Sequence, residues 1–445
     1  MACLRPPNPL PGALQCLGQK GPHHLLHHHP KKPHKTPPKP LPPHQPHRPP
    51  PPPRPTPPPD ADLTIDLPSQ QLRPYLRLAY DALEPQLSAF LDSASPDWLI
   101  LDYAPYWAAR AARTRGIRCA FFSLFSASSL AFYGTPSRSR GGKARGPRPR
   151  NSWCPQSGSR SRPPSSRKLF DEEIGLFPDD SGVSEAYRFS VVIADCDIVA
   201  VRSCDELERD YLKLLETDMY RKPVVPLGLL PPVVPDDRVD STWDDLFEWL
   251  ERQKSRSVVY AAFGSEAKLS VEQVRRIAVG LESSELPFIW AFRRPQSVPE
   301  GVRVLPEGFA DRVGDRGIVC QGWAPQVNVL AHASVGGFLT HAGWNSVVEG
   351  LQHGRVLALL PLMFDQGLNA RLISARRAGV EVPRNEEDGS FTAEDIAATL
   401  RLVMVEEEGE VYRAAAEEMG RLFGDAELHD GYISEFLSFL VNYKG

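Results

Sequence analysis

The stretch Trp323–Gln366, WAPQVNVLAHASVGGFLTHAGWNSVVEGLQHGRVLALLPLMFDQ, decides the fold of this chain. Within it, the apolar run Ser334–His341 predicts a short buried strand, which the turn at Gly343 terminates. Trp344 begins a predicted helix, and Arg355–Pro361 predicts the next buried strand. A glycine turn between a strand and a helix presents free backbone N–H groups and the positive end of the helix dipole. The stretch therefore predicts an α/β nucleotide-binding unit with a diphosphate site at the start of the helix.

The polar side chains around that helix start suit a phosphorylated ribose. His341, Asn345 and Ser346 can donate hydrogen bonds to phosphate oxygens. Glu349 follows Asn345 by four positions and therefore shares its helix face, from which a carboxylate can accept from both ribose hydroxyls. The alternative for Glu349 is a solvated surface carboxylate.

Three residues at the ends of the stretch suit the remaining parts of a nucleotide sugar. Trp323 offers a flat face for a nucleobase, against the alternative that its ring belongs to the core. Asp365 and Gln366 follow the second strand and suit the vicinal hydroxyls of a sugar. Each of these patterns is weak when it is taken alone.

The stretch resembles the signature box of the plant UDP-dependent glycosyltransferases, a motif of 44 residues that begins with Trp and ends with Gln. The resemblance implies the GT-B architecture, in which two Rossmann-like doubly wound α/β domains face a cleft. The first domain would bind the acceptor and the second the UDP-sugar. The UDP-sugar-binding residues that it implies are Gly264, Ser265, Trp323, Ala324, Gln326, His341, Gly343, Trp344, Asn345, Ser346, Glu349, Asp365 and Gln366.

The resemblance also assigns a part of the molecule to each group. Trp323 would stack on uracil, with Ala324 and Gln326 framing the base, and Glu349 would hold the ribose. The turn at Gly264 and Ser265 would contact the diphosphate together with the helix start. Trp344, Asp365 and Gln366 would touch the donor sugar. Neither a metal nor a cofactor is expected, because the helix start and His341 would supply the positive environment for the leaving UDP.

Inverting sugar transfer needs a general base for the acceptor hydroxyl. In the resembled enzymes a His in the loop after the first strand is that base, and an Asp at the end of a later strand orients it. Asp102, at the end of the apolar run Asp97–Tyr103, matches this Asp, against the alternative of a helix cap. No credible counterpart of the His exists in the chain, because its N-terminal histidines lie among prolines. The first domain is therefore expected to be incomplete.

Composition divides the chain of 445 residues. Residues 1–60 hold 22 of the 46 prolines and predict a disordered Pro/His-rich tail. Residues 61–230 predict the acceptor-side domain, in which 137–168 form a disordered basic insert without acidic residues. A linker at 231–240, the UDP-sugar-binding domain at 241–425 and a last helix that packs back on the first domain at 426–445 complete the predicted order. We interpret 1–60 and 137–168 as altered reading frame, because each replaces family-like sequence over a bounded interval.

Helical spacing of apolar residues predicts one helix from Gln71 to Asp92 and a last helix from Ile433 to Tyr443. The seven cysteines show no metal-ligand spacing, and no apolar run reaches the length of a membrane span. We therefore expect a cytoplasmic monomer without stable membrane insertion. Its expected partners are a UDP-sugar and a small-molecule acceptor, with no nucleic acid.

The leading functional interpretation is transfer of a sugar from a UDP-sugar to a hydroxyl of a plant secondary metabolite. The resemblance is greatest to the branch that lengthens sugar chains on glycosylated flavonoids or terpenoids, and it leaves glucose and rhamnose open as the donor sugar. The alternative is a UDP-sugar-binding protein that is inactive because the His is missing. A third interpretation treats the basic segments as an interaction module for nucleic acid or for proline-recognising domains.

Overall fold

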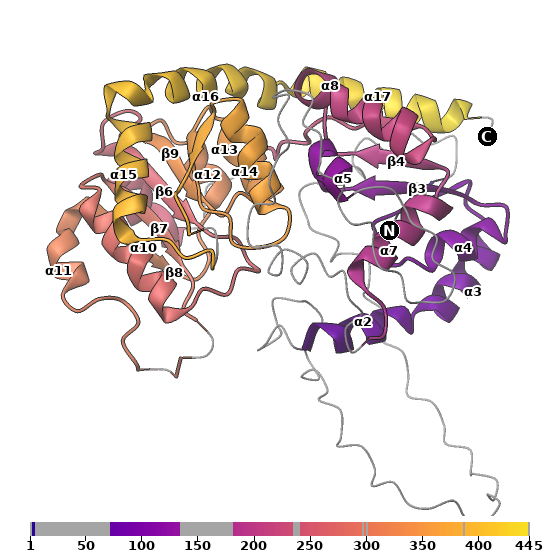
Figure 1. The fold of residues 1–445 in the computed structure, drawn as a ribbon, viewed down its shortest axis with the longest axis horizontal. Helices are drawn as coiled ribbons and strands as arrows, with labels where there is room; N and C mark the ends of the chain where they lie inside the picture. Colours follow the sequence, from indigo (N-terminus) through magenta and orange to yellow (C-terminus); the bar gives the residue numbers. More distant parts are fainter. Residues whose placement is uncertain are drawn as a thin grey trace, which may run out of the picture.

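The computed structural model describes residues 2–4, 72–133, 181–234, 241–295, 298–299, 301–385 and 388–443. These residues form two halves, each built on one sheet (Figure 1). Most of the predicted tail, the whole basic insert and residues 235–240 of the predicted linker lie outside the described residues. In the described part of the chain, no helix is long and apolar enough to span a bilayer.

The first sheet has the strand order β1-β2-β3-β4-β5. Its strands are β1 (Ala2–Leu4), β2 (Trp98–Leu101), β3 (Arg118–Ser123), β4 (Ile198–Val201) and β5 (Val224–Pro226). Neighbours from β2 to β5 are parallel, and their continuous apolar runs are buried, as is typical of a sheet covered on both faces. The helices of this half are α2 (Arg73–Asp81), α3 (Glu84–Ala94), α4 (Ala108–Arg113), α5 (Ala127–Tyr133), α7 (Glu185–Asp195) and α8 (Asp205–Leu214), which continues into the π-helical turn Leu215–Tyr220.

Strand β1 differs from the expectation that residues 1–60 contain no strand. It pairs antiparallel with β2, with Ala2 opposite Ile100. These three residues precede Pro6, the first proline of the chain, so their backbone N–H groups remain free to pair. The first half thus carries a short edge strand beside β2.

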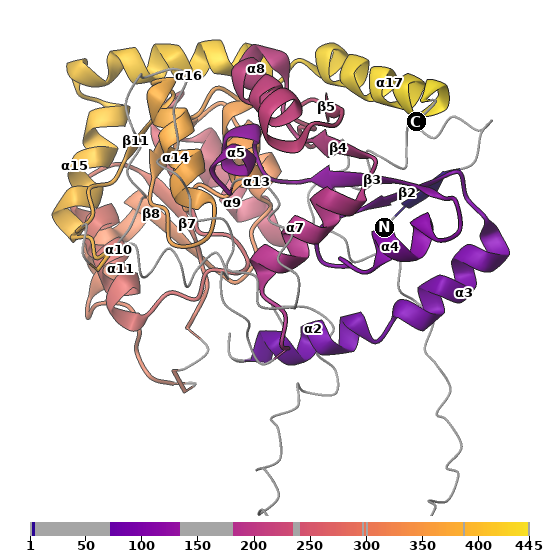
Figure 2. The same ribbon diagram turned by 45° about the vertical axis from the view of Figure 1, so that its right-hand side comes forward.

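The predicted single helix over 71–92 is two helices, because α2 ends at Asp81 and α3 begins at Glu84. Pro85 lacks a backbone N–H, and its ring would collide with the carbonyl of Asp81 in a continuous helix. The two helices therefore run around the first half as separate segments (Figure 2).

The second sheet is wholly parallel and has the strand order β11-β10-β9-β6-β7-β8. Its strands are β6 (Val258–Ala262), β7 (Phe288–Phe292), β8 (Gly317–Gln321), β9 (Val335–Thr340), β10 (Val356–Leu359) and β11 (Gly379–Glu381). Numbered within this half, that is the 3-2-1-4-5-6 order of a dinucleotide-binding fold, with the order reversing between β6 and β9. Ligands of such sheets bind at the carboxyl ends of the strands at this switch point.

The helices of the second half are α9 (Asp244–Glu251), α10 (Val271–Ser283), α11 (Phe309–Val313), α12 (Gln326–Ala331), α13 (Trp344–Leu351), α14 (Gln366–Ala375), α15 (Ala393–Met404) and α16 (Glu410–Phe423). Short 3₁₀ turns lie at Ser241–Trp243, Gly314–Arg316 and Glu407–Gly409. Helix α10 begins with a capping box in which Ser270 and Gln273 satisfy each other's backbone N–H groups. One large apolar core joins these helices to the sheet.

The last helix, α17 (Ala426–Asn442), returns to the first half and lies along it beside α8 (Figures 1 and 2). It begins seven residues earlier than the apolar pattern predicts, because the Asp425 carboxylate accepts from the backbone N–H of Leu428 and caps the helix. Ile433, Phe436 and Leu440 of α17 are buried against one face of the first sheet. The apolar core of the first half therefore includes the end of the chain.

Candidate functional site

The switch point of the second sheet brings together residues that the sequence places far apart. Gly264 and Ser265 follow β6, whereas His341 and Gly343 follow β9, which pairs with β6. Gly264 has φ of +73°, a left-handed conformation that favours glycine. The two turns thus lie at the same edge of the sheet, where this class of fold binds its ligand.

The imidazole of His341 occupies the space that both glycines leave open. A Cβ atom on Gly343 would lie 2.5 Å from Nε2 of His341, and a Cβ on Gly264 would lie 2.7 Å from the same atom. Any other residue at either position would have to displace the ring. Burial lowers the pKa of His341 to about 4, so the ring is neutral at pH 7. His341 is therefore a hydrogen-bonding group at this pH, which differs from the expectation that it shares the charge of a leaving diphosphate.

Helix α13 begins directly after this turn, with Gly343 as its N-cap and no side-chain cap. The N–H groups of its first turn have no partner within the helix, so they are available to an anion. Asn345 is exposed, whereas Ser346 is buried. The indole of Trp344 is also buried and donates from Nε1 to the carbonyl of Arg202 at 3.1 Å, which leaves only its backbone N–H for a ligand.

One turn further along α13, Glu349 lies in a short chain of hydrogen bonds. Tyr260 in the middle of β6 donates to Oε1 of Gln326 at 3.4 Å, and Nε2 of Gln326 donates to Oε2 of Glu349 at 2.5 Å. Burial raises the pKa of the Glu349 carboxyl, while Gln326 and Arg202 oppose that shift. The structure therefore brings Gln326 and Glu349 together, although they lie on different helices.

Trp323 is 71% exposed, which overturns the alternative that its ring belongs to the core. It follows β8, while its neighbour Ala324 is buried at the start of the turn into α12. A large aromatic ring that is solvent-accessible is suited to stacking on a planar ligand.

The two residues after β10 are held by their surroundings. Asp365 accepts from Nδ2 of Asn369 at 2.8 Å, and burial raises the pKa of Asp365 to about 6. Gln366 uses Oε1 to accept the backbone N–H groups of Leu362 at 2.8 Å and Met363 at 2.9 Å. The loop after β10 is therefore closed by Gln366, whose amide NH2 group points away from these bonds.

Asn369 was not predicted from the sequence, yet it links this loop to the other half. Its Nδ2 also donates to the carbonyl of Ala342 at 3.1 Å, and its Oδ1 accepts from Ser126 at 3.2 Å and from Ser129 at 3.3 Å. Asn369 is completely buried. Its position three residues after Gln366 on α14 was the only available signal, since a polar residue on a helix is ordinarily assigned to the surface.

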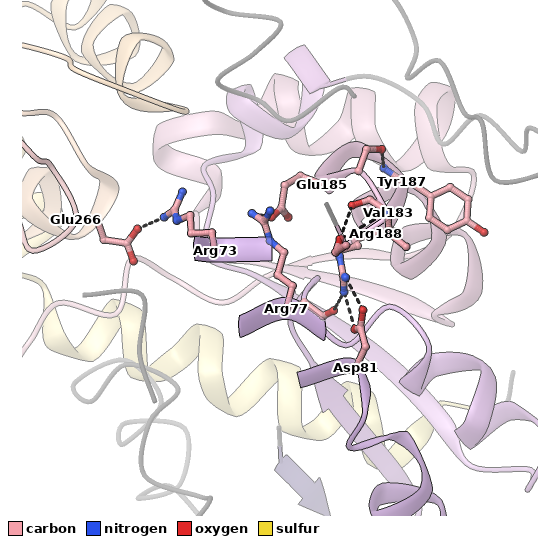
Figure 3. A network of polar contacts seen from close by, with 11 residues as sticks. Arg73, Arg77, Asp81, Val183, Glu185, Tyr187, Arg188 and Glu266 are labelled. Atoms are coloured by element: carbon pink, nitrogen blue, oxygen red, sulfur yellow. Dashed lines mark hydrogen bonds and ion pairs between the residues drawn. The ribbon is translucent and has the colours of Figure 1, made fainter. Parts of the chain in front are cut away.

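Another contact between the halves lies beside Gly264 and Ser265. Arg73 of α2 forms an ion pair with Glu266 and lies 5.1 Å from the ring centre of Phe364. Figure 3 shows that Arg73 belongs to a row of charged residues along α2, in which Arg77 pairs with Glu185 and the next pair is Asp81 with Arg188. This row joins α2 to α7 and to the turn after β6.

Asp102 stands apart from these residues, at the end of β2 in the first half. Its Oδ1 accepts from the backbone N–H of Ala104 at 2.9 Å, a local bond typical of a turn or cap. Burial raises the pKa of Asp102, and this local bond only partly offsets the shift. Within 72–133 and 181–234 the sequence contains no histidine, and the N-terminal histidines lie outside the described residues. No partner imidazole for Asp102 is therefore identified in the described part of the first half.

Comparisons with known proteins agree with this geometry. A family model described as UDP-glucoronosyl and UDP-glucosyl transferase matches residues 240–429, which include both turns and α13. UDP-glycosyltransferase 91C1 of Arabidopsis thaliana is 43% identical over 395 residues, a match that covers 86% of this chain and 82% of that protein. The chain belongs to the UDP-glycosyltransferase family. The predicted family is therefore confirmed.

Further relatives of this UDP-glycosyltransferase include a soyasaponin III rhamnosyltransferase of Glycine max, which is 38% identical over 397 residues and is matched over 87% of this chain and 82% of its own length. Among solved structures, UGT2 of Phytolacca americana, complexed with UDP-2fluoro-glucose and pterostilbene, superposes with a TM-score of 0.67 at 27% identity. That superposition covers 84% of this chain and 83% of the other. The predicted two-domain α/β fold of the GT-B type is confirmed.

Proposed function

We propose that this UDP-glycosyltransferase transfers a sugar, with inversion, from a UDP-sugar to a hydroxyl of a small plant secondary metabolite that already carries a sugar. One observation carries the proposal: the two turns at the β6–β9 switch point and the start of α13 converge around His341, with Glu349 one turn away. The name of one relative, anthocyanidin-3-O-glucoside rhamnosyltransferase of Petunia hybrida, supports a glycosylated acceptor. Glucose and rhamnose remain the two candidate donor sugars.

In this proposal each part of UDP has a stated place. Uracil stacks on the exposed face of Trp323, beside Ala324 and Gln326. Glu349 accepts from the ribose hydroxyls, and Gln326 holds that carboxylate in place through its hydrogen bond.

The diphosphate takes the backbone N–H groups of Trp344 and Asn345 at the start of α13. It also takes donors from Ser346, from His341 and from the turn at Gly264 and Ser265. Because the pKa of His341 lies near 4, the ring contributes a neutral donor, and the helix end supplies positive potential. The proposed site needs no metal, because these groups surround the charge that develops on UDP.

The sugar lies against Asp365 and Gln366. An ionised Asp365 accepts from sugar hydroxyls, and the NH2 group of Gln366 donates to them, because Oε1 of that amide is already occupied by the loop. Trp344 contributes its backbone rather than its indole. Burial raises the pKa of Asp365 to about 6, and the hydrogen bond from Asn369 opposes that shift.

The chemical step joins the acceptor oxygen to the anomeric carbon as the bond from that carbon to the UDP oxygen breaks. UDP leaves with the electron pair of the broken bond, and the proton of the acceptor hydroxyl passes to a general base. Asp102 is the proposed relay that stabilises this base after it takes the proton. Its raised pKa supports a position away from bulk water, as a relay beside a bound acceptor requires.

Calorimetric titration with UDP and a UDP-release assay with UDP-glucose and UDP-rhamnose test the proposal. Tight UDP binding, release of UDP only when a glycosylated acceptor is present, and loss of UDP affinity in Glu349→Ala are expected. Binding without release, for any acceptor, favours the alternative of an inactive UDP-sugar-binding protein. Failure of the purified protein to bind UDP at millimolar concentration would refute both.

Two further parts of the proposal concern the state of the protein. We infer a cytoplasmic monomer that acts on soluble substrates and does not bind nucleic acid. Sedimentation of the purified full chain, with and without UDP, is expected to give the mass of one chain of 49.4 kDa. A stable dimer in that experiment would contradict this part alone.

A further inference from the structure

Arg202 is a buried arginine of the first half that reaches the start of α13 in the second half. It follows β4 directly and is 2% exposed. Its backbone is fixed at both ends, because its N–H donates to the carbonyl of Ser123 at 3.0 Å and its own carbonyl accepts from Trp344. The side chain therefore leaves a rigid strand end and points across the interface between the halves.

The guanidinium of Arg202 makes its hydrogen bonds to uncharged acceptors. Nε donates to the carbonyl of Leu229 at 2.7 Å, and Nη2 donates to the carbonyl of Leu230 at 3.1 Å. Nη1 donates to Oδ1 of Asn345. Among the described residues no carboxylate forms an ion pair with Arg202, and Glu349 is the one acid near enough to raise its pKa. Burial lowers that pKa to about 10, so the group stays charged at pH 7.

A buried cation without a directly paired carboxylate is costly unless another group compensates its charge. Arg202 lies beside the first turn of α13, whose free N–H groups also favour an anion. The two features add positive potential at one place. A bound diphosphate would compensate the charge of Arg202 and accept from the free N–H groups of α13.

The bond to Asn345 has a second consequence, because an amide has one acceptor end and one donor end. Since Arg202 occupies the oxygen, the NH2 group of Asn345 faces the other way, on the exposed side of the residue. Without an arginine the amide could rotate and present its oxygen to a phosphate, which would repel it. Arg202 thus selects the orientation in which Asn345 donates.

We propose that Arg202 is a positioning residue of the donor site, which holds the Asn345 amide with its NH2 group toward the diphosphate of a UDP-sugar and compensates the phosphate charge from the acceptor-side half. This inference rests on the proposed UDP-sugar site and adds a residue from the other half to it. Its consequence is that donor binding strengthens the contact between the two halves.

Calorimetry on the full chain with UDP and with uridine as separate probes tests this inference, because uridine lacks the diphosphate. In Arg202→Met the affinity for UDP is expected to fall about 10- to 100-fold, the usual range for a lost hydrogen bond to a charged group. The affinity for uridine is expected to change less than about twofold, within the error of such a comparison. Unchanged UDP affinity in folded Arg202→Met, or an equal loss for both probes, would overturn the role of Arg202.

Arg355→Met is the matched control. Arg355 is also a buried arginine that donates to backbone carbonyls, at 2.7 Å to Leu330 and 3.1 Å to His332, and burial lowers its pKa to about 10 as well. It precedes β10 and thus lies at the opposite end of the sheet from the carboxyl ends. Arg355→Met should lower the melting temperature without changing the ratio of UDP to uridine affinity.

A double-mutant cycle keeps the test decisive should Arg202→Met fail to fold. Arg202→Lys retains the charge, and Asn345→Ala alters an exposed side chain. If Arg202 acts through Asn345, the lysine substitution weakens UDP binding in the parent chain but has little further effect in Asn345→Ala. Additive losses would overturn the inference. Absence of UDP binding in the parent chain would instead refute the proposed function.

Discussion

Replacement of Gly343 by alanine tests the geometry of the diphosphate site with a single methyl group. Gly343 has φ of −61° and ψ of 140°, which any residue adopts, so the substitution imposes no backbone strain. The new Cβ would lie 2.5 Å from Nε2 of His341, whereas ordinary contact begins at 3.4 Å. The imidazole must therefore retreat by about 0.9 Å, the difference between these two distances. Nε2 also lies close to Gly264, so little free space remains for this movement.

A shift of this size breaks a hydrogen bond, because a donor–acceptor distance near 2.9 Å would become about 3.8 Å. A hydrogen bond from a neutral donor to a charged phosphate contributes about 1.5 to 3 kcal/mol, which corresponds to about 10- to 100-fold in affinity. Gly343→Ala is therefore expected to raise the Kd of UDP by that factor, as measured by calorimetry. Overpacking should also cost about 1 to 3 kcal/mol of unfolding free energy.

Two further variants make the result interpretable. Gly431→Ala on α17 is the control, because nothing lies within 4 Å of its Cβ position, and it should leave UDP affinity unchanged. In the double variant Gly343→Ala/His341→Ala the steric conflict disappears, so its UDP affinity should equal that of His341→Ala alone. If Gly343→Ala binds UDP as tightly as the parent chain, His341 does not contact the diphosphate and the geometric reasoning is wrong.

Three other outcomes follow from the same structure. Because burial raises the pKa of Asp365 to about 6, this carboxylate takes up a proton as the pH falls through 6, so the Kd of UDP-glucose should rise there in the parent chain and stay level in Asp365→Asn; a parent Kd that does not change between pH 7 and pH 5 would contradict the assigned sugar contact. Asp81→Ala leaves Arg188, which is 2% exposed, without its carboxylate and should lower the free energy of unfolding in urea by about 3 to 5 kcal/mol, whereas Asp92→Ala removes an exposed ion pair and should leave the unfolding midpoint nearly unchanged. Trp323→Ala should leave the melting temperature unchanged, because the ring is 71% exposed. It should lower the affinities for UDP and for uridine alike by about 5- to 100-fold through lost stacking. If both affinities stay unchanged, Trp323 is not part of the site.

The part of the fold that could be predicted from the sequence is the part in which glycines and apolar runs mark the ends of helices and strands. The strand β9, the turn at Gly343, helix α13 and strand β10 lie where the apolar runs and glycines place them. Pro85 also signals the break between α2 and α3, but the regular spacing of apolar residues across this position favours a single helix. Short elements such as β11 carry too few residues for any period to be recognised.

The unpredicted members of the site share a different property, because their importance depends on contacts between segments distant in sequence. Arg202 follows an apolar strand and resembles any polar residue at a strand end, yet it meets Asn345 at a separation of 143 positions. Tyr260 lies in the middle of β6, where an aromatic residue predicts core, and its hydroxyl nevertheless supports Gln326. No periodicity or spacing encodes such contacts; they arise only when segments distant in sequence pack together.

Helix α17 also determines when the first half of this enzyme can complete its folding. Phe436 and Leu440 close one face of the first sheet, although they belong to the last residues of the chain. During synthesis that face therefore stays exposed to solvent until α17 has been made, which happens only after the whole second half. Truncation before Phe436 would therefore destabilise the half that was made first, and a fragment that contains only the first half would expose the apolar face that α17 covers.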